Sequence, residues 1–112
     1  KPGLELSAAV KPNILDARTT FHQDWVRWLN QGLVDYVCLM SYTPYLNKVL
    51  KRTISRVKEP QRVIIGLAGY CLSPRQIREQ VQLVNNSPFS GISFFSYESI
   101  KKNPVYLQAL LP

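Results

Sequence analysis

Short apolar runs that end in a tyrosine recur along this chain. Residues 37–42 (VCLMSY) and 92–97 (ISFFSY) both end in Ser-Tyr, and residues 62–70 (RVIIGLAGY) lie between them. Strands buried on both faces of a parallel sheet read as continuous runs rich in Val, Ile and Leu. The carboxyl ends of such strands meet at one rim, where α/β barrels carry their sites. Function should therefore be sought in the residues that end these runs.

Helix-like segments alternate with the apolar runs. Strands are expected over residues 4–10, 36–42, 62–67 and 91–97, and a polar loop is expected from 11 to about 20. Helices are expected over residues 23–31, 46–57, 74–84 and 104–111. In the second of these helices, the spacing typical of one buried face connects Leu46, Val49, Leu50, Ile54 and Val57.

Four strand–helix units in this order indicate an α/β protein with parallel strands. A complete (β/α)8 barrel takes about 250 residues, so this chain of 112 residues is close to half of one. We expect a single partial domain over residues 1–112, the C-terminal half (about strands five to eight) of a TIM-type (β/α)8 barrel. The alternative is a small doubly wound sheet, although no glycine-rich dinucleotide loop follows the first strand.

Charge limits the partners that the chain is expected to bind. The net charge is +7, from 14 Lys and Arg against 7 Asp and Glu. Such a balance suits a nucleic-acid or other anionic partner. However, no RNA-binding signature accompanies the cations. We expect a solvated helix surface and no nucleic-acid site, with the cations at Lys48, Lys51, Arg52, Arg56, Lys58, Arg75 and Arg78.

Cofactors, metals and membrane spans are not expected. Cys38 and Cys71 form no CxxC motif and His22 is the only histidine, which argues against a metal site. The apolar runs fall far short of the roughly 20 residues that span a bilayer. The chain opens abruptly beside a strand, without a signal peptide, as expected of a fragment of a longer protein.

Four blocks give the chain a specific resemblance. Residues 7–13 (SAAVKPN), 24–43 (DWVRWLNQGLVDYVCLMSYT), 64–70 (IIGLAGY) and 91–100 (GISFFSYESI) occur in this order. Together they resemble bacterial family-10 glycosyl-hydrolase-like proteins, which are often described as lipoproteins and are distant relatives of chitinase-like enzymes. The resemblance implies the second half of a barrel, an extracytoplasmic or cell-envelope location, and a carbohydrate ligand.

One motif of that larger group can be followed residue by residue. A Met-x-Tyr-Asp segment on the sixth strand of chitinase-like enzymes contacts the sugar beside the scissile bond. Met40 and Tyr42 match this segment, whereas Thr43 stands where the aspartate would be. The resemblance implies sugar contacts at these three positions, and the threonine argues against chitinase-type, substrate-assisted chemistry.

Tyrosines at strand ends are the main candidates for binding a sugar. Tyr42, Tyr45, Tyr70 and Tyr97 lie at or just beyond strand ends that share the expected rim. A tyrosine offers an apolar face and a polar tip, which suit the C–H face and the hydroxyls of a sugar ring. The structural alternative is that each ring packs on the core and bonds a loop carbonyl.

Polar residues at the same rim complete the candidate site. Glycoside hydrolysis generally uses two carboxylates, and only Glu98, directly after the last strand, is well placed here. It is a candidate for catalysis or substrate contact; the alternative is a helix cap or a solvated loop charge. Lys11 and Asn13 leave the first strand and are candidate donors to sugar hydroxyls or a carboxylate, unless they form only a solvated turn.

Two hypotheses follow from these features. The first is that the chain is part of a glycoside hydrolase acting on a polysaccharide, and supplies an aromatic sugar-binding rim. The second is a non-catalytic glycan-binding or envelope-associated barrel module, which Thr43 favours. In both, the partner is a missing N-terminal half of the barrel or a second copy paired through open sheet edges. The chain alone is expected to be inactive.

Overall fold

A sheet of four parallel strands forms the centre of the protein. The computed structural model describes residues 2–111, and its strands lie in the order β1-β2-β3-β4. The strands are β1 (Ser7–Val10), β2 (Tyr36–Met40), β3 (Val63–Ala68) and β4 (Gly91–Phe95). The helices are α1 (Ile14–Thr19), α2 (Trp25–Asn30), α3 (Leu46–Arg56), the 3-10 turn η1 (Pro60–Arg62), α4 (Pro74–Asn85), α5 (Tyr97–Lys102) and α6 (Val105–Leu110).

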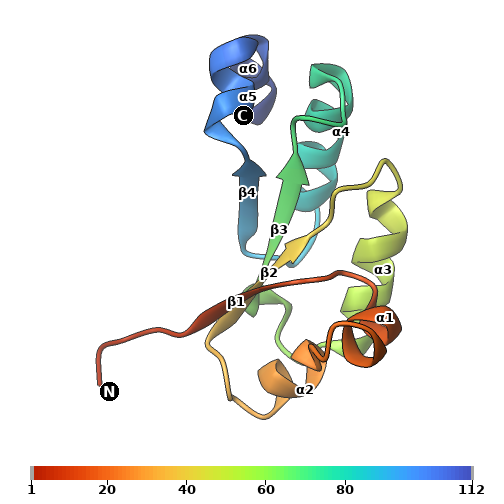
Figure 1. Ribbon diagram of the computed structural model, residues 1–112, viewed down its shortest axis with the longest axis vertical. Coiled ribbons are helices and arrows are strands. Elements are labelled where there is room, and N and C mark those ends of the chain that lie inside the picture. Colours follow the sequence, from red (N-terminus) through yellow and green to blue (C-terminus); the bar gives the residue numbers. More distant parts are fainter. Residues whose placement is uncertain (1, 112) are drawn as a thin grey trace.

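Helices cover one face of this sheet. Side chains alternate between the two faces of a strand, and the register aligns the buried positions of neighbouring strands, such as Leu39 with Ile65. Figure 1 shows α3 and α4 along the same side of the strands. The fully buried strand residues on this face are Val10, Val37, Leu39, Val63, Ile65 and Leu67.

The opposite face of the sheet is open. Its central positions are the half-buried Cys38, Met40 and Ile64 and the exposed Ser93 and Phe95. The Cys38 thiol donates a hydrogen bond to the Ser93 hydroxyl across 3.5 Å. Parallel sheets are usually covered on both faces, so this open face is unusual for the fold.

The expected α/β class and parallel pairing are confirmed. The strand order follows the chain without the reversal that defines a doubly wound sheet, so the alternative topology is wrong. The start of α4 also carries a capping box, in which Ser73 and Gln76 each bind the other's backbone N–H. Within residues 2–111, no helix combines the length and apolar character needed to cross a membrane.

The first loop differs from expectation. Residues 14–19 form helix α1 instead of a polar loop, because Asn13 caps it by accepting a hydrogen bond from the Asp16 N–H at 3.0 Å. Ala17 gives the helix one fully buried contact with the core. The first strand is also shorter than expected, since it begins at Ser7 and leaves Leu4 and Leu6 exposed.

The buried side of α3 and the helices near the end of the chain also differ from expectation. In α3 the buried side includes Thr53, while Ile54 is 44% exposed. The Thr53 hydroxyl is satisfied by donating to the Val49 carbonyl at 2.8 Å, so threonine can be buried there. Near the end of the chain the expected helix is present as α6, and Leu107 of α6 is exposed. A further helix, α5, begins at Tyr97, which was expected to end the last strand.

Candidate functional site

Three aromatic rings from three different strands meet at the carboxyl rim of the sheet. Tyr42 follows the end of β2, Tyr70 follows the end of β3, and Phe95 is the last residue of β4. The Tyr42 and Phe95 rings stack with centroids 6.0 Å apart, and Tyr70 meets them edge-on at 5.9 and 6.3 Å. These distances lie within the range of favourable aromatic pairs. We call these three residues the aromatic cluster.

A pocket of about 560 Å³ opens beside this cluster. Ligand sites commonly have volumes of about 300–1,000 Å³, so the space is large enough for a small organic ligand. We call it the rim pocket. It combines two rings of the cluster with polar groups from the β4 end, α5 and α6, and is lined by Gly69, Tyr70, Phe95, Ser96, Glu98, Ser99, Lys102, Asn103 and Tyr106.

Glu98 and Lys102 supply charge to the rim pocket. Both belong to α5, where Glu98 lies in the first turn and Lys102 in the last. Each charge is therefore at the end of the helix that its dipole favours. Within residues 2–111 neither side chain takes part in a salt bridge, so both are available to a ligand. A carboxylate accepts from sugar hydroxyls and an ammonium donates to their oxygens.

Gly69 allows the wall of the rim pocket to form. A Cβ atom at this position would lie 2.4 Å from Phe94 and 3.0 Å from Ser99. The Gly69 N–H donates to the Phe95 carbonyl at 2.8 Å, which holds the β3 and β4 ends together. The peptide bond between Phe95 and Ser96 is cis.

The Tyr42 hydroxyl is partly withdrawn from solvent. Burial raises the pKa of Tyr42 above its usual 10.0, and Cys38 and Tyr70 add to that rise when they are ionised. The hydroxyl is consequently protonated at neutral pH and remains a hydrogen-bond donor.

Tyr45 and Tyr97 lie outside the aromatic cluster. Tyr45 is 64% exposed, and the Lys48 ammonium lies 5.5 Å from the centre of its ring. Tyr97 is 73% exposed and begins α5. Of the four tyrosines expected at the rim, the structure therefore brings together Tyr42 and Tyr70, with Phe95 as the third ring.

The remaining candidates occupy separate places. The Lys11 ammonium lies 5.0 Å from the centre of the Phe21 ring, and Asn13 caps α1. Met40 ends β2 on the open face of the sheet. Thr43 serves its own loop, because its hydroxyl accepts from the Tyr45 N–H at 3.1 Å. The Thr43 carbonyl accepts from the buried Gln80 amide at 2.7 Å.

Phe95 is the member of the cluster that sequence reasoning did not select. The last strand ends in Phe95-Ser96-Tyr97, and the repeated Ser-Tyr ending draws attention to the tyrosine. The strand ends at Phe95, however, and α5 begins at Tyr97. In the sheet, Phe95 pairs with Ala68, which lies two residues before Tyr70. The register of the strands therefore places Phe95 level with the end of β3.

The fold defines an α/β protein with an all-parallel sheet, and its rim carries an aromatic pocket. Among residues 2–111 no group of three His, Cys, Asp or Glu side chains is arranged to hold a metal ion. No protein-family model matches the chain, and neither a curated protein nor a solved structure matches it.

Proposed function

We propose that this chain binds carbohydrate at the aromatic cluster and rim pocket, as part of a glycoside-hydrolase-like α/β barrel. The observation that carries the proposal is the meeting of Tyr42, Tyr70 and Phe95 from three strand ends beside a pocket with Glu98 and Lys102. The aromatic faces suit the C–H faces of sugar rings, and the charged and hydroxyl groups suit their hydroxyls.

The proposed barrel is a TIM-type (β/α)8 barrel of which this chain forms the C-terminal half, about strands five to eight. Three features support this part of the proposal: the strand order follows the chain, the helices cover one face, and the other face is open. The inner face of a barrel is covered only when the sheet closes on itself. The remaining strands come either from an N-terminal half or from a second copy.

Glu98 is the proposed acidic group for hydrolysis of a polysaccharide. Glycosidases generally need a second carboxylate, about 5–5.5 Å away when the configuration is retained and about 6.5–9.5 Å away when it is inverted. Glu98 is the only acidic residue that lines the rim pocket within residues 2–111. Under this proposal the second acid belongs to the rest of the barrel.

The second candidate function is a non-catalytic glycan-binding or envelope-associated module. It is favoured by Thr43, whose hydroxyl and carbonyl are already used by the loop that contains it. A threonine here cannot supply the negative charge of an aspartate. Turnover by the completed barrel, abolished by Glu98→Gln, supports the hydrolase; glycan binding without turnover supports the non-catalytic module.

Sugar binding is tested with two tyrosines of equal exposure. Tyr70 in the cluster is 65% exposed, and Tyr45 outside it is 64% exposed, so the two truncations remove rings of nearly equal exposure, and circular dichroism should show that both variants remain folded. Saturation-transfer NMR with chito-, cello- and xylo-oligosaccharides identifies a bound sugar, and titration gives its affinity. Tyr70→Ala should weaken binding by about tenfold, roughly 1.4 kcal/mol, and Tyr45→Ala by less than twofold. Absence of binding, or equal losses in both variants, would contradict the proposal.

A further inference from the structure

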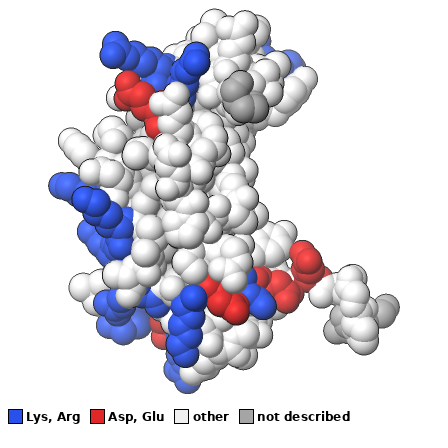
Figure 2. Space-filling model, turned by 180° about the vertical axis from the view of Figure 1, so that it is seen from behind, with Lys and Arg blue, Asp and Glu red and all other residues white. Residues whose placement is uncertain are grey.

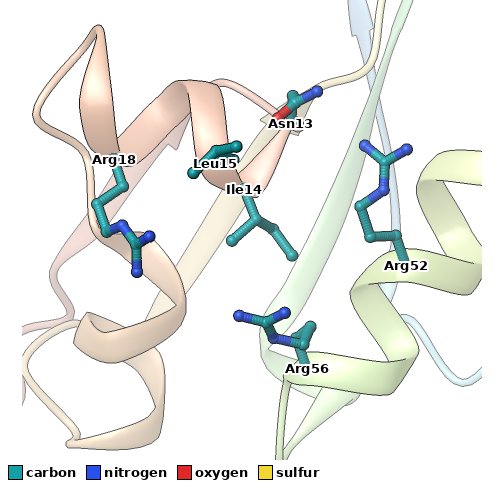
Figure 3. Close-up of a pocket in the computed structure, with 6 residues that line it drawn as sticks. All are labelled: Asn13, Ile14, Leu15, Arg18, Arg52 and Arg56. Carbon is teal, nitrogen blue, oxygen red and sulfur yellow. The ribbon is translucent and has the colours of Figure 1, made fainter.

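Three arginines line a second pocket, on the opposite flank of the protein from β4. The pocket has a volume of about 430 Å³ and lies between α1 and α3. In Figure 3, Arg56 extends from α3 toward Ile14, while Arg18 extends from α1 on the other side of that residue. Its lining residues are Asn13, Ile14, Leu15, Arg18, Arg52 and Arg56. We call it the arginine pocket.

The positive charge of this pocket is not neutralised by the protein. Within residues 2–111 the salt bridges are Arg62–Glu59 and Arg75–Glu79, so the three pocket arginines have no carboxylate partner there. Helix α3 contains no acidic residue, and α1 contains only Asp16. An Asp16 oxygen already accepts from the Thr20 hydroxyl at 2.8 Å. Figure 2 shows Lys and Arg gathered along the side of the molecule where α3 lies.

The helix dipole accounts for only two of the three arginines. Arg18 and Arg56 lie in the last turns of their helices, where the helix dipole favours a cation. Arg52 has no such advantage. It also lies four residues before Arg56, and like charges at this spacing destabilise a helix by a few tenths of a kcal/mol. An anion in the pocket would offset this repulsion.

The donors and walls of the pocket indicate what kind of anion fits. A guanidinium presents several N–H donors in a planar fork that matches phosphate and carboxylate oxygens. Asn13 uses its side-chain oxygen to cap α1, which leaves its amide nitrogen as a further donor. The side chains of Ile14 and Leu15 add an apolar wall. This combination suits an anionic group attached to an organic body.

We propose that the arginine pocket binds a small organic phosphate or sulfate ester. A tetrahedral oxyanion has at least three acceptor oxygens, so it satisfies donors from several arginines better than the two oxygens of a carboxylate. The pocket is much larger than the oxyanion itself and leaves room for the attached group against Ile14 and Leu15. It shares no lining residue with the rim pocket, so this proposal is independent of carbohydrate binding.

The test titrates the chain with phenyl phosphate and phenyl sulfate, using calorimetry at physiological salt. Phenol serves as the uncharged control, and inorganic phosphate separates an ester site from a free-ion site. Saturable binding of either ester, tighter than that of inorganic phosphate and phenol, is expected. Arg52→Gln and Arg56→Gln should each weaken it by about tenfold, because each removes charge-assisted hydrogen bonds.

Lys51→Gln is the matched control for these variants. Lys51 is an exposed cation of the same helix and does not line the pocket. Its replacement should change ester affinity by less than twofold, and circular dichroism should show that all three variants remain folded. The proposal is overturned by absence of saturable binding, by equal losses in Lys51→Gln and Arg52→Gln, or by binding only to a long polyanion such as heparin.

Discussion

The rings of Tyr42 and Phe95 stack at 24° although their strands are not neighbours in the sheet. Strand β3 lies between β2 and β4, and Tyr70 from its end meets both rings nearly at right angles, at 81° and 85°. Aromatic packing thus connects three consecutive strand ends, in addition to the backbone hydrogen bonds. The same rings form the surface for which we propose carbohydrate binding.

The Tyr42–Phe95 contact should be measurable as a coupling free energy. Aromatic pairs contribute about 0.5–1.5 kcal/mol beyond the area that they bury. In a double-mutant cycle of Tyr42→Ala and Phe95→Ala, we expect a coupling of about 1 kcal/mol in the free energy of urea unfolding. The control cycle combines Phe95→Ala with Tyr45→Ala in place of Tyr42→Ala. Tyr45 forms no aromatic pair within residues 2–111. The two substitutions of the control cycle should be additive; equal coupling in both cycles would contradict a direct contact.

Gly66 is expected to be essential for close packing of β2 on β3. A Cβ atom at this position would lie 2.7 Å from the backbone carbonyl of Leu39, so the strands would have to move apart. Gly66→Ala should lower the free energy of unfolding by about 1–3 kcal/mol. Gly91→Ala in β4 is the control, since nothing lies within 4 Å of its Cβ position. Thermal unfolding that is equally affected in both variants would show that the close approach does not matter.

The sequence pattern predicted the strands and helices in which apolar residues repeat regularly over several positions. Strands β2 and β3 and helices α3 and α4 were foreseeable because their buried residues repeat at strand or helix spacing. Helix α1 was not foreseeable in this way, because only Ala17 of its residues is buried and its formation depends on the Asn13 cap.

The candidate site was predictable in part for a related reason. Strand ends indicate which residues reach the rim, and this rule pointed to Tyr42 and Tyr70. It could not separate Phe95 from Tyr97, because the residue at which β4 gives way to α5 decides which ring faces the cluster. The arginine pocket could not be predicted from the sequence either. Arg18 is distant in sequence from Arg52 and Arg56, and these residues line one pocket only because α1 lies beside α3 in the fold.

Stability should depend on the ionisation of Tyr42 at high pH. The pKa of its hydroxyl is raised in the folded protein, and the unfolded chain has the ordinary value of about 10. Above that pH the unfolded state binds fewer protons at this group than the folded state does, so stability falls as pH rises. The stability that the protonated Tyr42 hydroxyl contributes is fully present below about pH 10. It is lost as the pH rises through the pKa that this hydroxyl has in the folded protein.

Tyr42→Phe isolates this effect because it keeps the ring and removes the titrating hydroxyl. Urea unfolding of both proteins between neutral pH and high pH should show a smaller alkaline loss of stability in the variant. Tyr45→Phe is the control and should follow the unsubstituted protein. Parallel curves for Tyr42→Phe and the unsubstituted protein would contradict the predicted linkage.

The open face of the sheet should drive association with a second copy when the chain is studied alone. Ile64 lies at its centre, paired with Cys38 and Gly91, while its neighbours Val63 and Ile65 point into the helix-covered core. Sedimentation velocity should therefore show a concentration-dependent dimer or larger species, because both sheet edges also offer unpaired backbone groups. Ile64→Asp should shift this equilibrium toward monomer by placing a charge in the interface. Ile54→Asp introduces the same charge on the outer surface of α3 and should leave association unchanged. A chain that is folded and monomeric at all concentrations would rule out the second copy as the partner that covers this face.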